Sequence, residues 1–164
     1  MSVIRIVTAC WEFNRKRTLA TLDAIEQLPD PQAALAWRPG LGRAHIAWQM
    51  MHIGITEELF ATERLVGGAP EFPELVPRFR GGSTPDDDIP EIGSIRSVLE
   101  TSRLHLLNTT ASFSESDLQT IPEAFRQRGW TLETILHVIA WHEPHHQGQA
   151  HLTLNLFKAA HGIS

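Results

Sequence analysis

The amino-acid sequence predicts an all-α fold, a four-helix bundle formed by one domain that spans residues 1–164. Apolar residues recur at three- and four-residue intervals in four separate segments, which is the spacing of one face of an α-helix. Connections that contain proline and glycine separate these segments. No segment shows the alternation of apolar and polar residues that is typical of a strand. Four long helices with short to medium connections indicate a bundle, and 164 residues are most simply one domain.

The first two helices are predicted over residues 3–27 and 43–65. Pro29-Asp30-Pro31 ends the first helix. The second helix is apolar on most of its sides, which indicates a central position in the bundle. Gly67-Gly68-Ala69-Pro70 closes the second helix. The inner face of the first helix is marked by an apolar stripe: Ile4, Val7, Trp11, Leu22 and Ile25.

The third and fourth helices are predicted over residues 90–113 and 131–160. The connection before the third helix, residues 67–89, contains several prolines, glycines and aspartates. It is therefore predicted to be a long surface loop, a kind of segment that often carries function or moves. The spacing from Ser114 to Asp117 is that of a capping box and predicts a short helical turn. Thr131 is the predicted N-cap of the last helix.

Composition argues against two classes of partner. The formal net charge of −5 is unfavourable for binding nucleic acid or an acidic membrane surface. No apolar run approaches ~18 residues, so no membrane-spanning helix is predicted. The lone cysteine, Cys10, cannot form an internal disulfide and is typical of a reducing compartment. We therefore expect a cytoplasmic protein, with Cys10 as a small core residue rather than a nucleophile.

Histidines are concentrated near the C-terminus, where five of the nine lie between His137 and His151. His142 and His146 are four residues apart, so both rings leave the same face of the helix, roughly 5–6 Å apart at Cβ. Two imidazoles held in this way can share one metal ion. A buried unpaired imidazole pair would be costly, so the sequence predicts a metal site. The pair continues an inward-facing stripe of the last helix: Ile135, Ile139, Gln149, Thr153 and Leu156.

The letters from His142 to His146 also read His-Glu-x-x-His, the signature of zinc proteases. Such sites need a third ligand, in most cases downstream, but no aspartate or glutamate follows Glu143. The longer form of the motif has glycine three residues and histidine six residues after the second histidine. Gly148 and His151 lie two and five residues after His146, so neither residue is at the position that the longer motif requires. A proline inside the motif also bends the helix. A zinc hydrolase is therefore the second interpretation.

The third ligand must come from upstream, and His52 is the best candidate. It lies in the middle of the central helix, on an apolar stripe with Trp48 and Leu59. A lone histidine in such a place is usually a satisfied core residue. A pair of histidines on another helix of the bundle changes this expectation, because metal sites in bundles are built from side chains of facing helices.

Two segments resemble the DinB/YfiT-like family of small metal-binding four-helix bundles. They are Gly42-Arg43-Ala44-His45-Ile46-Ala47-Trp48-Gln49-Met50-Met51-His52 and the run from His142 to Gln149. The family has one histidine on the second helix and a His-x-x-x-His pair on the last, often followed by Gly-Gln. This sequence matches those positions with His52, His142, His146 and Gly148-Gln149, and the resemblance covers nearly the whole chain.

The resemblance implies a divalent metal, often zinc or nickel, held by His52, His142 and His146, and commonly a homodimer. Some relatives look like S-transferases that act with low-molecular-weight thiols such as bacillithiol, mycothiol or glutathione, and many have no assigned reaction. Three protein ligands leave positions open for water or a small-molecule substrate. We therefore expect a metal-dependent enzyme, with thiol S-transfer as the specific candidate. A His-Glu-x-x-His hydrolase and a non-enzymatic metal-binding bundle remain the alternatives.

Glu143 and Gln149 are the candidate catalytic residues. Glu143 could act as a general base, but it points about 100° away from the preceding histidine, so a solvated or ligand-supporting position is expected. Gln149, one turn beyond the pair, is expected to orient a ligand or bound water, or to satisfy a buried polar gap. His145 is an alternative ligand to His146. The other histidines are expected outside the site: His45, His105, His137, His151 and His161. All of them except His45 are expected at the surface.

Overall fold

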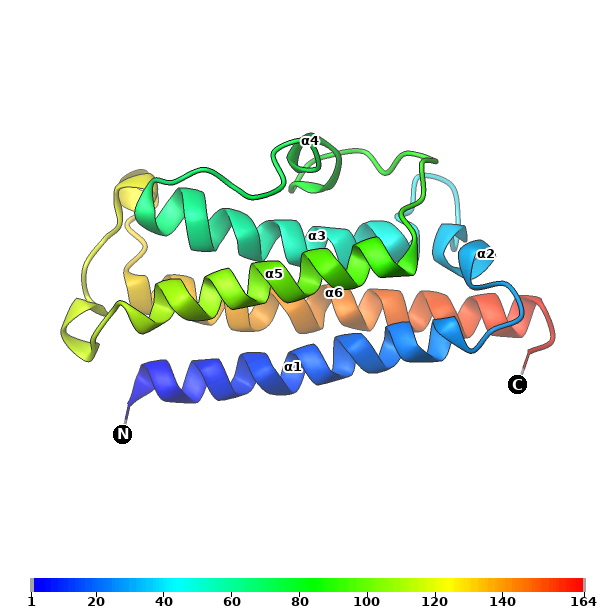
Figure 1. The fold of residues 1–164 in the computed structure, drawn as a ribbon, viewed down its shortest axis with the longest axis horizontal. Helices are drawn as coiled ribbons and strands as arrows, with labels where there is room; N and C mark the ends of the chain where they lie inside the picture. The colour runs from blue at the N-terminus through cyan, green and yellow to red at the C-terminus, as the bar shows by residue number, and fades with distance from the viewer. Residues whose placement is uncertain (1, 164) are drawn as a thin grey trace.

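The computed structural model describes residues 2–163, which contain helices and no strand. Four long helices form an elongated bundle (Figure 1): α1 (Val3–Glu26), α3 (Ile46–Glu58), α5 (Ile92–Ala111) and α6 (Leu132–Ala160). This arrangement confirms the predicted all-α four-helix bundle. Shorter elements lie in the connections: α2 (Pro31–Ala36), the π-helix η1 (Leu59–Arg64), α4 (Val76–Phe79), η2 (Glu115–Asp117) and η3 (Glu123–Arg128).

Local capping explains where α3 and α6 begin. The hydroxyl of Thr131, the predicted N-cap, accepts a hydrogen bond of 3.2 Å from the backbone N–H of Thr134 at the start of α6. In α3 the cap is the imidazole of His45, whose Nδ1 accepts from the backbone N–H of Trp48 at 3.0 Å. This cap satisfies a backbone donor that the first turn of a helix leaves unpaired. It also starts α3 three residues later than the sequence pattern predicts.

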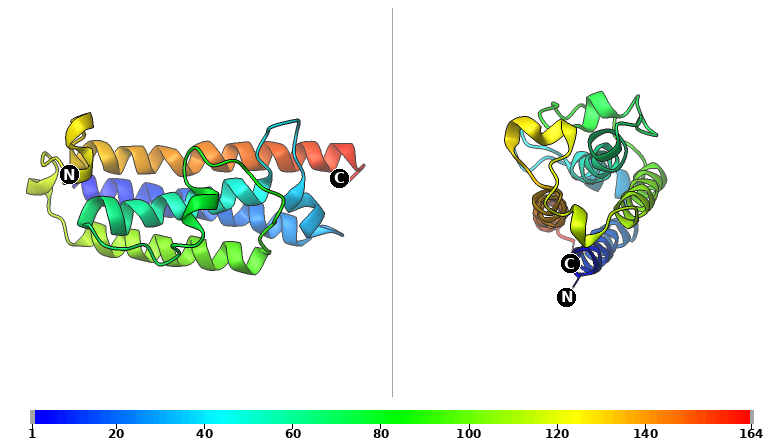
Figure 2. Two further views of the ribbon diagram at one scale, coloured as in Figure 1. Left: turned by 90° about the horizontal axis from the view of Figure 1, so that it is seen from above. Right: turned by 90° about the vertical axis from the view of Figure 1, so that its left-hand side faces the viewer.

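The helices pack in a defined order around the core. α1 lies along α6, whereas α3 contacts both α5 and α6 and so holds the central position that its apolar surface predicts (Figures 1 and 2). Two apolar clusters fill the interior. One lies around Leu22, Met50 and Leu99. The other lies around Trp11 and Ile135.

A quartet of buried charged residues, one from each long helix, lies in the interior of the bundle. Its members are Arg15 (α1), Glu57 (α3), Arg103 (α5) and Glu143 (α6), and none is more than 8% exposed. Arg15 lies 2.7 Å from each of the two carboxylates. Arg103 lies 2.5 Å from each of them. Opposite charges therefore alternate around the quartet and cancel.

The quartet is stable only as a complete unit. Burial alone would raise the pKa of Glu57, but the charges and hydrogen bonds of Arg15 and Arg103 hold that pKa below its ordinary value. The arginines also donate to backbone carbonyls, Arg15 to that of Leu99 and Arg103 to that of Trp11 at 2.6 Å. Because a buried charge without its partner is strongly unfavourable, the quartet fixes how the four helices face one another.

Two further sequence expectations concern the surface. Cys10 is exposed, so its predicted place in the core is wrong. The buried face of α1 runs through Val7, Trp11 and Arg15, and position 10 points away from it. Among the described helices, none is long and apolar enough to cross a membrane.

Removing one member of the quartet should cost far more stability than removing an exposed ion pair. The substitution Arg103→Met leaves two buried carboxylates with one arginine, and we expect it to lower the free energy of unfolding by about 3–5 kcal/mol. Arg126→Met is the matched control, because Arg126 pairs with Glu123 at the surface; it should cost less than about 1 kcal/mol. Urea unfolding monitored by circular dichroism measures both. Similar losses in the two variants would contradict this assignment.

Candidate metal centre

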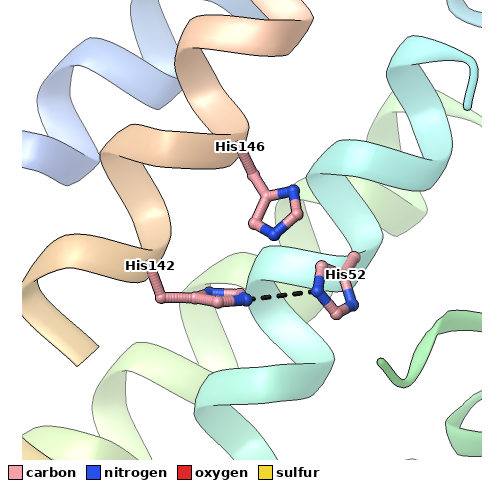
Figure 3. Close-up of side chains that lie close together, drawn as sticks. All are labelled: His52, His142 and His146. Carbon is pink, nitrogen blue, oxygen red and sulfur yellow. Dashed lines mark hydrogen bonds between the residues drawn. The ribbon is translucent and has the colours of Figure 1, made fainter. Parts of the chain in front are cut away.

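Three histidine side chains converge between α3 and α6 (Figure 3). His52 comes from α3, and His142 and His146 come from successive turns of α6. One ring nitrogen of each lies within 4.8 Å of those of the other two, and the Nε2 atoms of His52 and His142 are 3.1 Å apart. Two nitrogens bound to one tetrahedral zinc ion at 2.0–2.1 Å are about 3.3 Å apart. The structure thus brings the three predicted ligands together at a spacing that fits one ion.

His52 is oriented by the segment that crosses over α3 (Figure 1). Its Nδ1 lies 2.6 Å from the backbone carbonyl oxygen of Phe79. A carbonyl can only accept, so Nδ1 carries the proton and Nε2 presents a lone pair towards α6. Trp48 stacks on the ring with centroids 4.6 Å apart, and its indole N–H donates to the carbonyl oxygen of Arg78 at 3.1 Å. The predicted loop therefore holds a ligand of the site in place.

His146 is oriented by a chain of two glutamines. Its Nδ1 lies 2.5 Å from Oε1 of Gln49, one turn before His52 on α3. Nδ1 donates to this oxygen, which leaves Nε2 for the cluster. Gln49 in turn donates to Oε1 of Gln149 at 3.1 Å, and Gln149 lies 2.9 Å from Nε2 of His145. Gln149 thus acts on the ligand through Gln49, a supporting arrangement that is common around metal-binding histidines.

The imidazoles of the cluster are neutral at ordinary pH. Burial lowers the pKa of His142 to about 3 and that of His146 to about 3, and the neighbouring histidines add to both shifts. Burial also lowers the pKa of His52, against the hydrogen bond to Phe79. A neutral imidazole is the form that binds a metal, so the rings need not lose protons before binding.

Glu143 lies on a different side of α6 from the histidine pair. Its Oε1 accepts hydrogen bonds from Arg15 and Thr18 at 2.7 Å each, and its Oε2 accepts one from Arg103 at 2.5 Å. The residue is 2% exposed, so of the two positions predicted for it the solvated one is wrong. The buried stripe of α6 includes Leu136, Ile139, Glu143 and Ala150, and this spacing in the sequence could have placed Glu143 in the core.

The remaining histidines have other surroundings. His145 is exposed and stacks on Trp141, with ring centroids 4.6 Å apart. His45 caps α3, as described above. His105 lies 2.8 Å from a carboxylate oxygen of Glu58 and its side chain is 31% exposed, so its predicted surface position holds in part. The last three histidines are exposed as predicted: His137, His151 and His161.

Comparison with known proteins is consistent with this architecture. A sequence model described as the DinB superfamily matches residues 11–150, a range that contains the whole histidine cluster. The chain belongs to the DinB superfamily. This confirms the resemblance that the two histidine-containing segments indicate. No curated protein matches the chain.

Several residues that support the site of this DinB-superfamily protein escaped the sequence analysis. Gln49 is three residues before His52, so it shares a face of α3 with that ligand, and this spacing was a usable signal. Arg15 is four residues after Trp11 on the buried face of α1, which is a similar signal. The Phe79 carbonyl had none, because every residue carries a backbone carbonyl and its direction leaves no pattern in the sequence.

Loss of one clustered histidine should lower metal content, whereas loss of an exposed histidine should not. His146→Ala removes a ligand of the proposed site, and we expect protein purified without a histidine tag to lose most of its bound zinc or nickel. His151→Ala is the control, because His151 lies on the same helix and is exposed. Inductively coupled plasma mass spectrometry measures the metal per chain. Equal loss in the two variants would show that the ligands are misassigned.

Proposed function

We propose that this protein is a metal-dependent enzyme in which His52, His142 and His146 hold one divalent ion, zinc or nickel. The observation that carries the proposal is the convergence of three neutral imidazoles between two helices, two of them oriented by hydrogen bonds from outside the cluster. Imidazole suits both metals. Structural zinc sites usually have four protein ligands, and the cluster contains no carboxylate or thiolate among residues 2–163. Three ligands favour a site that is open to water or substrate.

The reaction that we propose is transfer of a low-molecular-weight thiol to an electrophile. When bound, the ion supplies positive charge that favours the thiolate over the thiol. The thiol proton passes to solvent, the sulfur forms a bond to the electrophilic carbon, and the leaving group departs with its electron pair. The protein contributes the geometry: Phe79 orients His52, and Gln49 orients His146. The proposed step requires no protein thiol, and the cluster consists of histidines alone among residues 2–163.

The environment of Glu143 favours the transferase over the hydrolase alternative. A hydrolase of the His-Glu-x-x-His kind uses this glutamate as a general base beside the metal. Here both carboxylate oxygens are held by Arg15, Thr18 and Arg103 inside the bundle. A carboxylate neutralised by two buried arginines is poorly placed to accept a proton from water at the histidine cluster.

The test is a conjugation assay with a panel of small thiols and alkylating electrophiles, using zinc- and nickel-loaded protein. We expect turnover that a chelator abolishes, that returned metal restores, and that His142→Ala eliminates. His137→Ala is the control, because His137 is exposed on the same helix, and it should retain full activity. Turnover that survives metal removal would overturn the mechanism. Cleavage of ester or amide substrates without any thiol conjugation would favour the hydrolase.

We also propose that the protein is a cytoplasmic homodimer that acts on a small molecule and binds neither nucleic acid nor membrane. The lone Cys10 suits a reducing compartment, and the net charge of −5 disfavours polyanionic partners. Large apolar side chains on the outer faces of α1 and α6, Phe13 and Trp141, are more than half exposed and support pairing with a second copy.

Light scattering coupled to size-exclusion chromatography tests the oligomeric state. At high protein concentration we expect twice the mass of one chain, because burial of exposed apolar surface between two copies favours association. The mass of a single chain at every concentration would contradict the dimer.

A further inference from the structure

A small pocket lies beside the histidine cluster, between the turn that precedes α3 and the C-terminal half of α6. Its volume is about 180 Å³. Gln49 and Gln149 form its wall on the side of the cluster, and Leu152 and Leu156 provide apolar lining. The pocket is connected to a metal ligand by direct contact, because Gln49 accepts the hydrogen bond of His146.

Of the residues that line the pocket, Arg43 alone is charged, and it is exposed in the turn before α3. Among residues 2–163, no hydrogen bond or ion pair involves the guanidinium of Arg43. Its backbone N–H donates to the carbonyl oxygen of Gly40 at 3.2 Å, and its carbonyl oxygen accepts from Arg38. The neighbouring arginines differ, since Arg38 pairs with Asp87 and Arg78 pairs with Asp86. No acidic residue lines the pocket. An uncompensated arginine at a concave site in a protein of net charge −5 is suited to bind an anion.

We propose that this pocket binds the carboxylate of a small substrate, with Arg43 as the residue that selects it. A guanidinium pairs with a carboxylate through two parallel hydrogen bonds, a geometry that a neutral group cannot match. Gln49 and Gln149 offer amide groups to the middle of such a molecule, and Leu152 contacts its apolar atoms. The inference rests on the proposed function in one respect: it specifies that the thiol acted on at the histidine cluster carries a carboxylate.

The order of the parts supports this substrate class. The histidine cluster, the two glutamines and Arg43 follow one another from the centre of the bundle towards the surface turn, through shared lining residues. A molecule with sulfur at one end and a carboxylate at the other matches this order of a metal site, amide groups and a cation. The size of the pocket limits such a molecule to a few non-hydrogen atoms between the sulfur and the carboxylate.

The binding experiment uses 3-mercaptopropionic acid, its primary amide and 2-aminoethanethiol as probes of zinc-loaded protein. Calorimetry gives the dissociation constants, and the side-chain amide resonances of Gln49 and Gln149 report whether the pocket is occupied. We expect the acid to bind roughly tenfold more tightly than the amide, which is the scale of a hydrogen-bonded charge pair. Arg43→Gln should remove this preference, and Arg43→Glu should reverse it in favour of the cationic aminothiol.

Arg5→Gln is the matched control, because Arg5 is exposed near the start of α1, and it should keep the tenfold preference for the acid. Equal affinity for acid and amide in the wild type would overturn the inference, and so would a preference that survives Arg43→Gln. Propionate, which lacks sulfur, separates the two proposals. Arg43-dependent binding of propionate without conjugation of any thiol would support the pocket and reject thiol transfer. Conjugation of thiols without a preference for acids would support thiol transfer and reject the pocket.

Discussion

The buried charge quartet is the constraint on which the rest of the structure depends. Each of the four long helices contributes one charge, and each charge is tolerated in the core only because the other helices neutralise it. Glu143 therefore fixes the rotation of α6. On an ideal helix His142 and His146 lie about 100° and 60° to the same side of Glu143. With Glu143 directed at Arg15 and Arg103, both histidines are directed at α3, where His52 lies.

The site combines this rigid frame with support from an irregular segment. Residues 65–91 connect the second long helix to the third and cross over α3, where the Phe79 carbonyl and the stacked Trp48 hold His52. The segment is itself clamped, because Arg78 binds both carboxylate oxygens of Asp86 at 2.9 and 3.0 Å. The bundle thus sets where the three histidines lie, and the crossing segment sets which nitrogen of His52 faces the other two.

Sequence periodicity was sufficient for the helices and for the pairing of two of the clustered histidines. Four apolar stripes gave the four long helices, and the four-residue spacing gave the His142–His146 pair. The same reasoning was wrong about which residues are buried in the second half of α6. The stripe through Gln149 and Leu156 was expected inside, yet both residues are exposed and the helix buries Ala150, Leu154 and Phe157 instead. Periodicity shows that a helix has a buried face. Which of its residues form that face depends on long-range partners such as Arg15, which no local pattern identifies.

The central claim is that three imidazoles hold one divalent ion, and X-ray absorption spectroscopy of metal-loaded, tag-free protein tests it most directly. We predict three imidazole nitrogens at 2.0–2.1 Å from zinc, no sulfur neighbour, and a loss of one imidazole in His52→Ala. Glu143→Gln should remove no carboxylate neighbour from the spectrum, because both Glu143 oxygens are held by Arg15, Thr18 and Arg103. A wild-type spectrum with fewer than three imidazoles, or with a carboxylate that disappears in Glu143→Gln, would contradict the account.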